Sequence, residues 1–206
     1  MIAIVDYGAG NLHSISGAMK TLTEDVTVTS DKNILAKAAG IILPGVGAFG
    51  DAADRLRETG LGDAVTARAK AGVPLLGVCL GMQLLFEKSF EYGVHSGLGL
   101  LKGEIAPMAC DLKEKVKVPH MGWNALDIQE ECALTRYIQN GDYVYYVHSF
   151  YAKGIDSLNA RSEYGNLLIP GMVSKGYVFG CQFHPEKSGR VGLNILKAFW
   201  EATEHA

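Results

Sequence analysis

The sequence predicts an α/β fold: a doubly wound, mostly parallel central sheet with helices on both faces and a mixed or antiparallel strand extension in the C-terminal half. Two observations predict it. In the first ninety residues, short runs of apolar and β-branched residues alternate with segments of helical periodicity. From about residue 101, β-rich runs follow one another at short intervals, with Gly, Asn and Asp turns between them.

The elements follow in this order along the chain. Runs without a polar side predict parallel strands covered by helices on both faces, and their alternation with helices predicts right-handed crossovers. No internal repeat or Pro-rich linker divides the sequence, so we expect one domain over residues 1–206. Expected in the first half are strands at 2–5, 26–29, 41–43 and 75–78 and helices at 12–22, 52–57 and 61–71. Expected in the second half are strands at 104–106, 116–118, 125–128, 143–147 and 178–183 and a last helix at 191–203.

Composition and charge exclude several classes of protein. Hydrophobic residues make up 48% and charged residues 20% of the chain, which argues against a disordered or collagen-like protein. A net charge of −3 without a basic block argues against a nucleic-acid or anionic-membrane surface. The most apolar stretch, 73–86, is too short and interrupted to span a membrane, and the chain starts with a strand pattern and not a signal peptide. Four cysteines without C-x-x-C spacing are expected to be reduced thiols, so we expect a soluble cytoplasmic protein.

The most informative segment is Gly-Val-Cys-Leu-Gly at residues 77–81, where a buried strand leads directly into a helix. It fits the nucleophile elbow Gly-x-nucleophile-x-Gly, with Cys79 as nucleophile and glycines where side chains would collide in the sharp turn. The helix N-terminus favours a thiolate, and the N–H of Leu80 points toward an oxyanion formed on a substrate carbonyl. Gln83, one helical turn on, could contact the same ligand. The simpler alternative is an ordinary buried cysteine.

A thiolate nucleophile needs a base and a residue that orients the base, and the His-Pro-Glu segment that begins at His184 offers both. Pro185 favours an extended conformation at His184, which would place His184 and Glu186 on the same side. Cys79, His184 and Glu186 are therefore the candidate catalytic triad. A zinc site at Cys181 and His184 is the alternative, but no second Cys/His pair has suitable spacing, and no metal is expected.

Two glycine-containing loops follow predicted parallel strands. The loop 43–49, Leu-Pro-Gly-Val-Gly-Ala-Phe, can present bare N–H groups that complete an oxyanion hole with Leu80. The loop 6–13 approaches a dinucleotide-binding fingerprint, but that pattern requires glycine where His13 stands. No nicotinamide or other cofactor is therefore expected. The role of His148 is ambiguous, because it lies at a predicted strand end.

Together these segments resemble the class I, triad-type glutamine amidotransferases, over nearly the whole chain. Within that family the sequence is similar to the glutaminase subunits of imidazole glycerol phosphate synthases. The elbow and the His-Pro-Glu segment are common to the superfamily. Three segments are narrower: Asp-Tyr-Gly-Ala-Gly-Asn at 6–11, Pro-Gly-Val-Gly at 44–47 and Pro-His-Met-Gly-Trp-Asn at 119–124. The stretch 88–93 is less acidic than is usual in the family, and we assign it no catalytic role.

The resemblance implies that the chain hydrolyses L-glutamine to glutamate and ammonia through a thioester on Cys79. It implies an oxyanion hole from the backbone around Val46, Gly47 and Leu80. It further implies that four residues seat the glutamine: Gly47, Gln83, Ser149 and Phe150.

The resemblance also implies a partner, a separate cyclase subunit with a (β/α)₈ barrel. That subunit would use the ammonia to form imidazole glycerol phosphate and an aminoimidazole carboxamide ribotide in histidine biosynthesis. Residues expected near the partner are Asn11, Trp123, Lys187 and the segment 143–146. Their alternative roles are helix cap, core aromatic, solvated charge and strand aromatics.

Two other hypotheses stay open. A glutaminase subunit for another acceptor, as in pyridoxal phosphate or anthranilate synthesis, would share the triad but carry a different loop from that at 44–47. A redox-sensing or ligand-binding protein could have an elbow cysteine without turnover. Such a protein would not need His184, Glu186 or Gln83.

Overall fold

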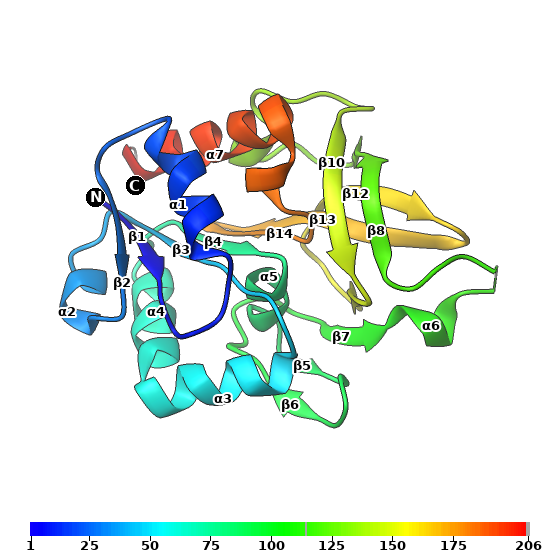
Figure 1. Cartoon of the computed structure of the whole chain (residues 1–206), viewed down its shortest axis with the longest axis horizontal. Coiled ribbons are helices and arrows are strands. Elements are labelled where there is room, and N and C mark those ends of the chain that lie inside the picture. The colour runs from blue at the N-terminus through cyan, green and yellow to red at the C-terminus, as the bar shows by residue number, and fades with distance from the viewer. Residues whose placement is uncertain (114, 205–206) are drawn as a thin grey trace.

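The computed structural model describes residues 1–113 and 115–204, and its largest unit is an eight-stranded sheet (Figure 1). From one edge to the other its strands are β2 (Val26–Thr29), β1 (Ile2–Val5), β3 (Gly40–Leu43), β4 (Leu75–Val78), β14 (Val178–Cys181), β13 (Leu167–Lys175), β12 (Leu158–Tyr164) and β9 (Asp127–Ile128). The first five run parallel, and β13, β12 and β9 extend the sheet antiparallel. The predicted fold class is confirmed.

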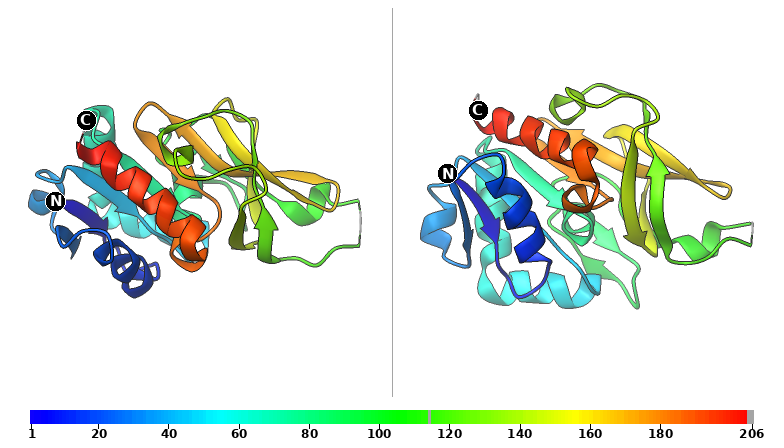
Figure 2. Two further views of the ribbon diagram at one scale, coloured as in Figure 1. Left: turned by 90° about the horizontal axis from the view of Figure 1, so that it is seen from above. Right: turned by 45° about the horizontal axis from the view of Figure 1, so that its top comes forward.

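Helices cover both faces of the parallel strands (Figure 2). The helices in the described part of the chain are α1 (Leu12–Lys20), α2 (Lys32–Leu35), α3 (Phe49–Thr59), α4 (Leu61–Lys70), α5 (Leu80–Leu84), α6 (Met108–Asp111) and α7 (Gly189–Glu204), with 3₁₀ turns η1 (Ala133–Thr135) and η2 (Pro185–Lys187). Of these, α6 lies away from the parallel strands (Figure 1). Along β1, Ile2 and Ile4 share one buried cluster with residues of α1 and α7, whereas Ala3 and Val5 share another with residues of α3 and α4. The strand is apolar throughout because successive side chains enter different cores.

Two smaller sheets pack against the large one. The first pairs β8 (His120–Ala125) antiparallel with β10 (Tyr143–His148), and the second has the order β11 (Phe150–Lys153), β7 (Glu104–Pro107), β5 (Lys88–Ser89) and β6 (His95–Ser96). Strand β8 contacts β12, and β11 contacts β13. The end of β10 lies over the carboxyl end of β4, where the Val147 carbonyl oxygen is 3.8 Å from the Cys79 sulfur.

The prediction for the second half was partly wrong. Residues 116–118 form no strand, because β8 begins at His120, directly after Pro119, which has no N–H for a strand ladder. The hairpin of β12 and β13 was not predicted, although its Gly-Asn turn at 165–166 is a typical hairpin signal.

The strand expected at 125–128 is divided between two sheets. Strand β8 ends at Ala125, and β9 begins at Asp127 in the large sheet. Leu126 lies between the two strands, and its side chain is buried in the core. The interruption between β8 and β9 therefore allows Leu126 to pack in the core. Within residues 1–113 and 115–204, no helix is both long and apolar enough to cross a membrane.

Candidate active site

A strand, a sharp turn and a helix hold Cys79 at the carboxyl edge of the parallel strands. Cys79 follows β4 and has φ 54° and ψ −110°, a strained conformation for a residue with a side chain. The glycines on either side are required by space. A Cβ on Gly77 would lie 2.6 Å from the Gly81 carbonyl oxygen, and one on Gly81 would overlap the Leu43 carbonyl oxygen. This is the geometry of a nucleophile elbow.

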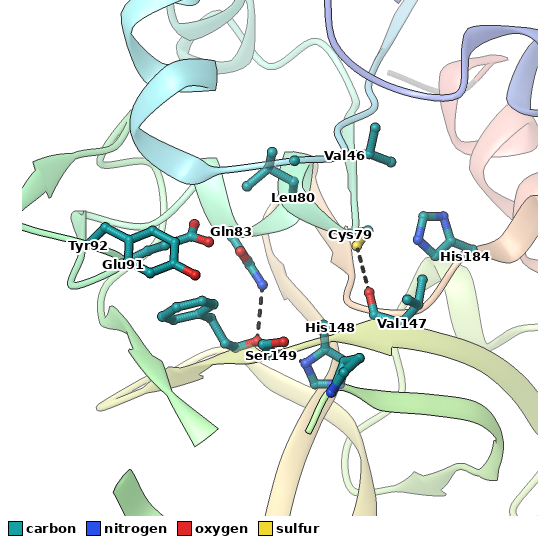
Figure 3. A pocket seen from close by; sticks show the side chains of 13 residues that line it. Val46, Cys79, Leu80, Gln83, Glu91, Tyr92, Val147, His148, Ser149 and His184 are labelled. Atoms are coloured by element: carbon teal, nitrogen blue, oxygen red, sulfur yellow. Dashed lines mark hydrogen bonds between the residues drawn. The ribbon is translucent and has the colours of Figure 1, made fainter. Parts of the chain in front are cut away.

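Cys79 opens onto a cavity of about 420 Å³ (Figure 3), a volume within the range of small-molecule sites. Its lining residues are Val46, Gly47, Cys79, Leu80, Gln83, Glu91, Tyr92, Pro119, Val147, His148, Ser149, Phe150 and His184. The structure therefore brings together Cys79, His184 and every residue predicted for the oxyanion hole and the substrate site. Glu186 does not line the cavity but lies behind His184.

His184 lies beside Cys79 (Figure 3), and Glu186 is bonded to the far side of its ring. Nδ1 of His184 is 2.8 Å from Oε1 of Glu186, and both side chains are buried. Nε2 is also buried and makes no hydrogen bond of ordinary geometry within the described part of the chain. Burial alone would lower the pKa of His184, but the Cys79 sulfur and the Glu186 carboxylate raise that pKa to about 9. His184 is therefore an imidazolium at neutral pH.

The contact between His184 and Glu186 forms across a turn and not along an extended chain, as the sequence had suggested. His184 keeps the extended φ of −98° and ψ of 98° that a following proline favours, but Pro185–Lys187 then form η2. Proline suits the first position of a helical turn because it has no N–H that would lose a partner. The Ser188 hydroxyl donates to the His184 carbonyl at 2.7 Å and fixes the turn.

Gln83 reaches from α5 into the cavity wall. Its Nε2 donates to the Phe150 carbonyl at 3.1 Å and to Oε1 of Gln182 at 3.0 Å (Figure 3 shows the first bond). Because both partners accept, both amide hydrogens are used, and Oε1 is the atom of Gln83 left for a ligand. Gln182 was not singled out from the sequence. The Nε2 atom of Gln182 lies 3.8 Å from the Cys79 sulfur. The sequence signal for Gln182 was its position two residues before His184.

The loop 43–49 is held at both ends. Near its start, the Tyr7 hydroxyl donates to the Pro44 carbonyl at 2.8 Å, and burial raises the pKa of Tyr7 well above its usual range, so it stays a neutral donor. At its end, the Phe49 N–H donates to a Glu91 carboxylate oxygen at 2.6 Å. Between these anchors Gly47 has φ +99°, which L side chains rarely adopt.

Glu91 is a cavity residue that sequence reasoning missed, in a stretch to which we assigned no catalytic role. Its side chain is largely buried, and burial raises its pKa while the Phe49 N–H and His95 oppose that shift. Tyr92 beside it is 88% exposed and lines the cavity rim. Nothing in the sequence marks position 91, since a lone glutamate near glycines usually indicates a solvated loop.

The residues expected near a partner differ in exposure. Trp123 on β8 is 55% exposed and Lys187 is exposed. Asn11 caps α1, since its side chain accepts from the Ser14 N–H at 3.2 Å. In the segment 143–146, Tyr143 is exposed whereas Tyr146 is fully buried, because alternate residues of β10 face the core, so only part of this segment is available at the surface.

Within residues 1–113 and 115–204, no group of three or more His, Cys, Asp or Glu side chains is placed to hold a metal ion. The alternative zinc site at Cys181 and His184 therefore has no further ligands there. Cys181 is fully buried, and burial raises the pKa of its thiol.

Comparison with known proteins identifies the family. Residues 3–202 match the family model described as glutamine amidotransferase class-I. The chain is 50% identical over 205 residues to the imidazole glycerol phosphate synthase subunit HisH of Bacillus cereus, with 99% of this chain and 96% of that one covered. It is 47% identical over 201 residues to the same subunit of Lactococcus lactis, with 97% and 98% covered. A crystal structure of a glutamine amidotransferase matches the fold with a TM-score of 0.77 at 20% identity, over 99% of this chain and 100% of that one. This chain therefore belongs to the class I glutamine amidotransferase family, in the group of imidazole glycerol phosphate synthase HisH subunits.

Proposed function

We propose that this chain is the glutaminase subunit of an imidazole glycerol phosphate synthase. It hydrolyses L-glutamine to glutamate and ammonia and delivers the ammonia to a cyclase subunit in histidine biosynthesis. The observation that carries the proposal is the elbow residue Cys79 beside His184, whose charge Glu186 stabilises, at the wall of a cavity of small-molecule size. The names of relatives about half identical over the whole chain support the pathway.

The first half-reaction forms a thioester. The Cys79 thiolate attacks the side-chain amide carbon of glutamine, and the carbonyl oxygen becomes an oxyanion that accepts from the N–H groups of Leu80, Val46 and Gly47. His184, protonated at neutral pH, gives its Nε2 proton to the amide nitrogen. The C–N bond then breaks, ammonia leaves, and the acyl group stays on sulfur.

The second half-reaction hydrolyses the thioester. Neutral His184 takes a proton from a water molecule whose oxygen attacks the acyl carbon. The C–S bond breaks, sulfur leaves as a thiolate beside the imidazolium, and glutamate is released. Glu186 takes no proton in either half-reaction; its role is to hold the ring through the 2.8 Å bond and to stabilise the imidazolium.

The cavity also offers groups for the amino-acid end of glutamine. Oxygen Oε1 of Gln83 can accept from the substrate, since both hydrogens of its amide are already used. Glu91, a carboxylate in the cavity wall, suits the α-ammonium group. With Ser149 and Phe150, which also line the cavity, these groups favour an amino acid that carries a side-chain amide.

The proposed acceptor is a cyclase subunit with a (β/α)₈ barrel, and the complex works in the cytoplasm. The relatives' names support a synthase made of subunits. We assign contacts with the cyclase to Trp123 and Lys187, whose side chains are available at the surface, and to Asn11 beside the start of α1.

Replacing Cys79 in the assembled complex tests this function. We expect Cys79→Ala to abolish synthesis from glutamine and to leave synthesis from ammonium salts unchanged, because the cyclase needs only ammonia. Cys110→Ala, at an exposed cysteine, is the matched control and should retain both activities. Loss of both activities in a Cys79→Ala complex that still assembles would contradict the proposal, as would retention of both.

A further inference from the structure

Two buried histidines on neighbouring strands are not used by the proposed chemistry. His120 on β8 and His148 on β10 are paired in register, and their side chains are buried. Nδ1 of His120 lies 2.9 Å from Nε2 of His148. His148 lines the cavity, whereas His120 lies one strand farther from it.

The partners of these rings determine every proton position. Nδ1 of His148 is 2.9 Å from the Phe150 carbonyl oxygen, which can only accept, so this nitrogen carries the hydrogen. Burial lowers the pKa of His148 to about 3 and that of His120 to about 4, so both rings are neutral. Nε2 of His148 must then accept, and Nδ1 of His120 must donate to it. Nε2 of His120 accepts in turn from the Asn124 amide at 3.3 Å.

Asn124 closes the outer end of this chain of bonds. Its second amide hydrogen goes to the Glu163 carbonyl at 2.7 Å, and its oxygen accepts from the Ala125 N–H at 2.8 Å. No amide flip would satisfy these partners equally well, since a flipped amide would point its oxygen at the Glu163 carbonyl. The hydrogen bonds from Asn124 through His120 to His148 therefore all donate in the same direction, toward His148.

The inner end of the chain is the Phe150 carbonyl, which lies in the cavity wall. Strand β11 is the edge of its sheet, and an edge leaves a row of backbone groups without ladder partners. Side chains bond this carbonyl instead, since it accepts from His148 at 2.9 Å and from Gln83 at 3.1 Å. The oxygen therefore joins the buried histidines to a residue that we assign to glutamine binding.

Shape alone does not explain a histidine at position 120. Its ring is stacked between Tyr146 and Tyr164, with centroids 4.5 and 4.0 Å away, and aromatic stacking of this kind requires no ring nitrogen. A buried polar ring without partners is costly, so the hydrogen bonds that His120 makes offset the cost of its burial. We propose that His120 is a positioning residue for the glutamine site: through His148 it fixes the Phe150 carbonyl and thereby the amide of Gln83. This inference rests on the proposed glutaminase function.

The proton positions can be tested on the unmodified chain. Nitrogen-15 NMR of histidine-labelled protein at pH 7 should find His120 and His148 both neutral and both protonated on Nδ1. Either ring protonated on Nε2, or either ring charged, would overturn the chain of bonds. This measurement needs no glutaminase activity, so it decides the network even if the proposed function fails.

Two substitutions then separate positioning from packing in the complex with the cyclase. His120→Phe keeps a ring between the tyrosines but removes the donor to His148, so we expect KM for glutamine to rise about tenfold with little change in kcat. His120→Asn loses the stacked ring but keeps an N–H near the Nδ1 position, so its KM should stay within about threefold of the wild type although it unfolds at a lower temperature.

Synthesis from ammonium salts should be unchanged in both variants and reports that the cyclase is active, whereas co-elution of the two subunits reports that the complex has assembled. Two results would overturn the proposal. In the first, the less stable variant, His120→Asn, shows the larger rise in KM for glutamine. In the second, His120→Phe has the same KM for glutamine as the wild type. If His120→Phe does not fold, the NMR measurement and the His120→Asn value of KM decide: a KM raised tenfold or more in the folded Asn variant would overturn the proposal.

Discussion

His184 and Glu186 form a closed pair in which Nδ1 and Oε1 are 2.8 Å apart and neither side chain is more than 3% exposed. Exposed ion pairs contribute little, because water screens them, but this pair is shielded from water. Removing either member leaves the other charge buried and without its partner, which is costly. The pair therefore controls both the charge of the imidazole and the direction in which its Nε2 points.

We expect Glu186→Gln to lower the pKa of His184 from about 9 toward the ordinary histidine value, because the buried carboxylate is among the groups that raise it. Glutamine-dependent kcat should fall at least about tenfold, since the ring loses its orientation and charge stabilisation. Ring NMR titration and steady-state kinetics measure the two effects. Glu58→Gln, at an exposed glutamate of α3, is the control. The expectation would be refuted if the pKa of His184 were the same in the wild type, in Glu186→Gln and in Glu58→Gln.

The raised pKa of His184 also predicts how stability depends on pH. Folding favours the protonated ring, so its contribution is complete below pH 6.5 and is lost as pH rises through about 9. The difference in unfolding free energy between wild type and His184→Gln should therefore shrink by about 3 kcal/mol between pH 6.5 and pH 9.5. Urea denaturation across this range measures the difference. A difference that grows with pH would mean that the ring is buried neutral.

Glu91 should discriminate in favour of substrates with an α-ammonium group. Glu91→Gln keeps the shape of the side chain and an oxygen for the Phe49 N–H, but removes the negative charge. We expect KM for glutamine to rise at least about tenfold, because a charge-assisted bond is lost. The analogue that lacks the α-amino group should be used equally poorly by both enzymes. If Glu91→Gln preferred glutamine over this analogue as strongly as the wild type does, another residue would bind the α-ammonium group.

A glycine substitution in the elbow, compared with a control substitution in α1, tests the packing of the elbow. A methyl group on Gly81 would overlap the Leu43 carbonyl, so Gly81→Ala should lower the free energy of unfolding by at least about 3 kcal/mol. Gly17 in α1 has no atom within 4 Å of a built Cβ, so Gly17→Ala should raise that free energy by about 0.5–1 kcal/mol. Thermal and urea denaturation of both variants measure these changes. A Gly81→Ala protein as stable as the wild type would show that the elbow can relax.

The parallel half of the fold could be predicted because its signals are local. The strands expected at 26–29 and 75–78 agree with the structure residue for residue, since each is a short apolar or β-branched run next to a helical pattern. Strand β12 was missed although a local signal exists. Leu158, Ala160 and Tyr164 alternate with the polar residues Asn159, Arg161 and Glu163. The signal is weak, because Ser162 interrupts the apolar positions and Asn and Glu are depleted in strands.

The candidate site divides in the same manner. Cys79 and His184 stand in motifs whose glycines and proline reveal the local backbone, so the sequence indicates both residue and role. Glu91 and Gln182 stand in no such pattern, and the segment 119–124 that contains His120 indicates the family without indicating a role for His120. Glu91 binds the Phe49 N–H 42 residues away, and its burial depends on how the second sheet folds over the cavity. Long-range packing of this kind has no local signature.

Covalent labelling with a chloroketone analogue of glutamine tests the central claim most directly, since the reagent places an electrophilic carbon where the amide carbon would lie. We predict one equivalent of adduct per chain in the complex with the cyclase, on Cys79, with protection by excess glutamine and no adduct in Cys79→Ala. Peptide mass spectrometry locates the modified residue among the four cysteines. Modification of another cysteine alone, or an adduct on Cys79 that glutamine does not prevent, would contradict the account.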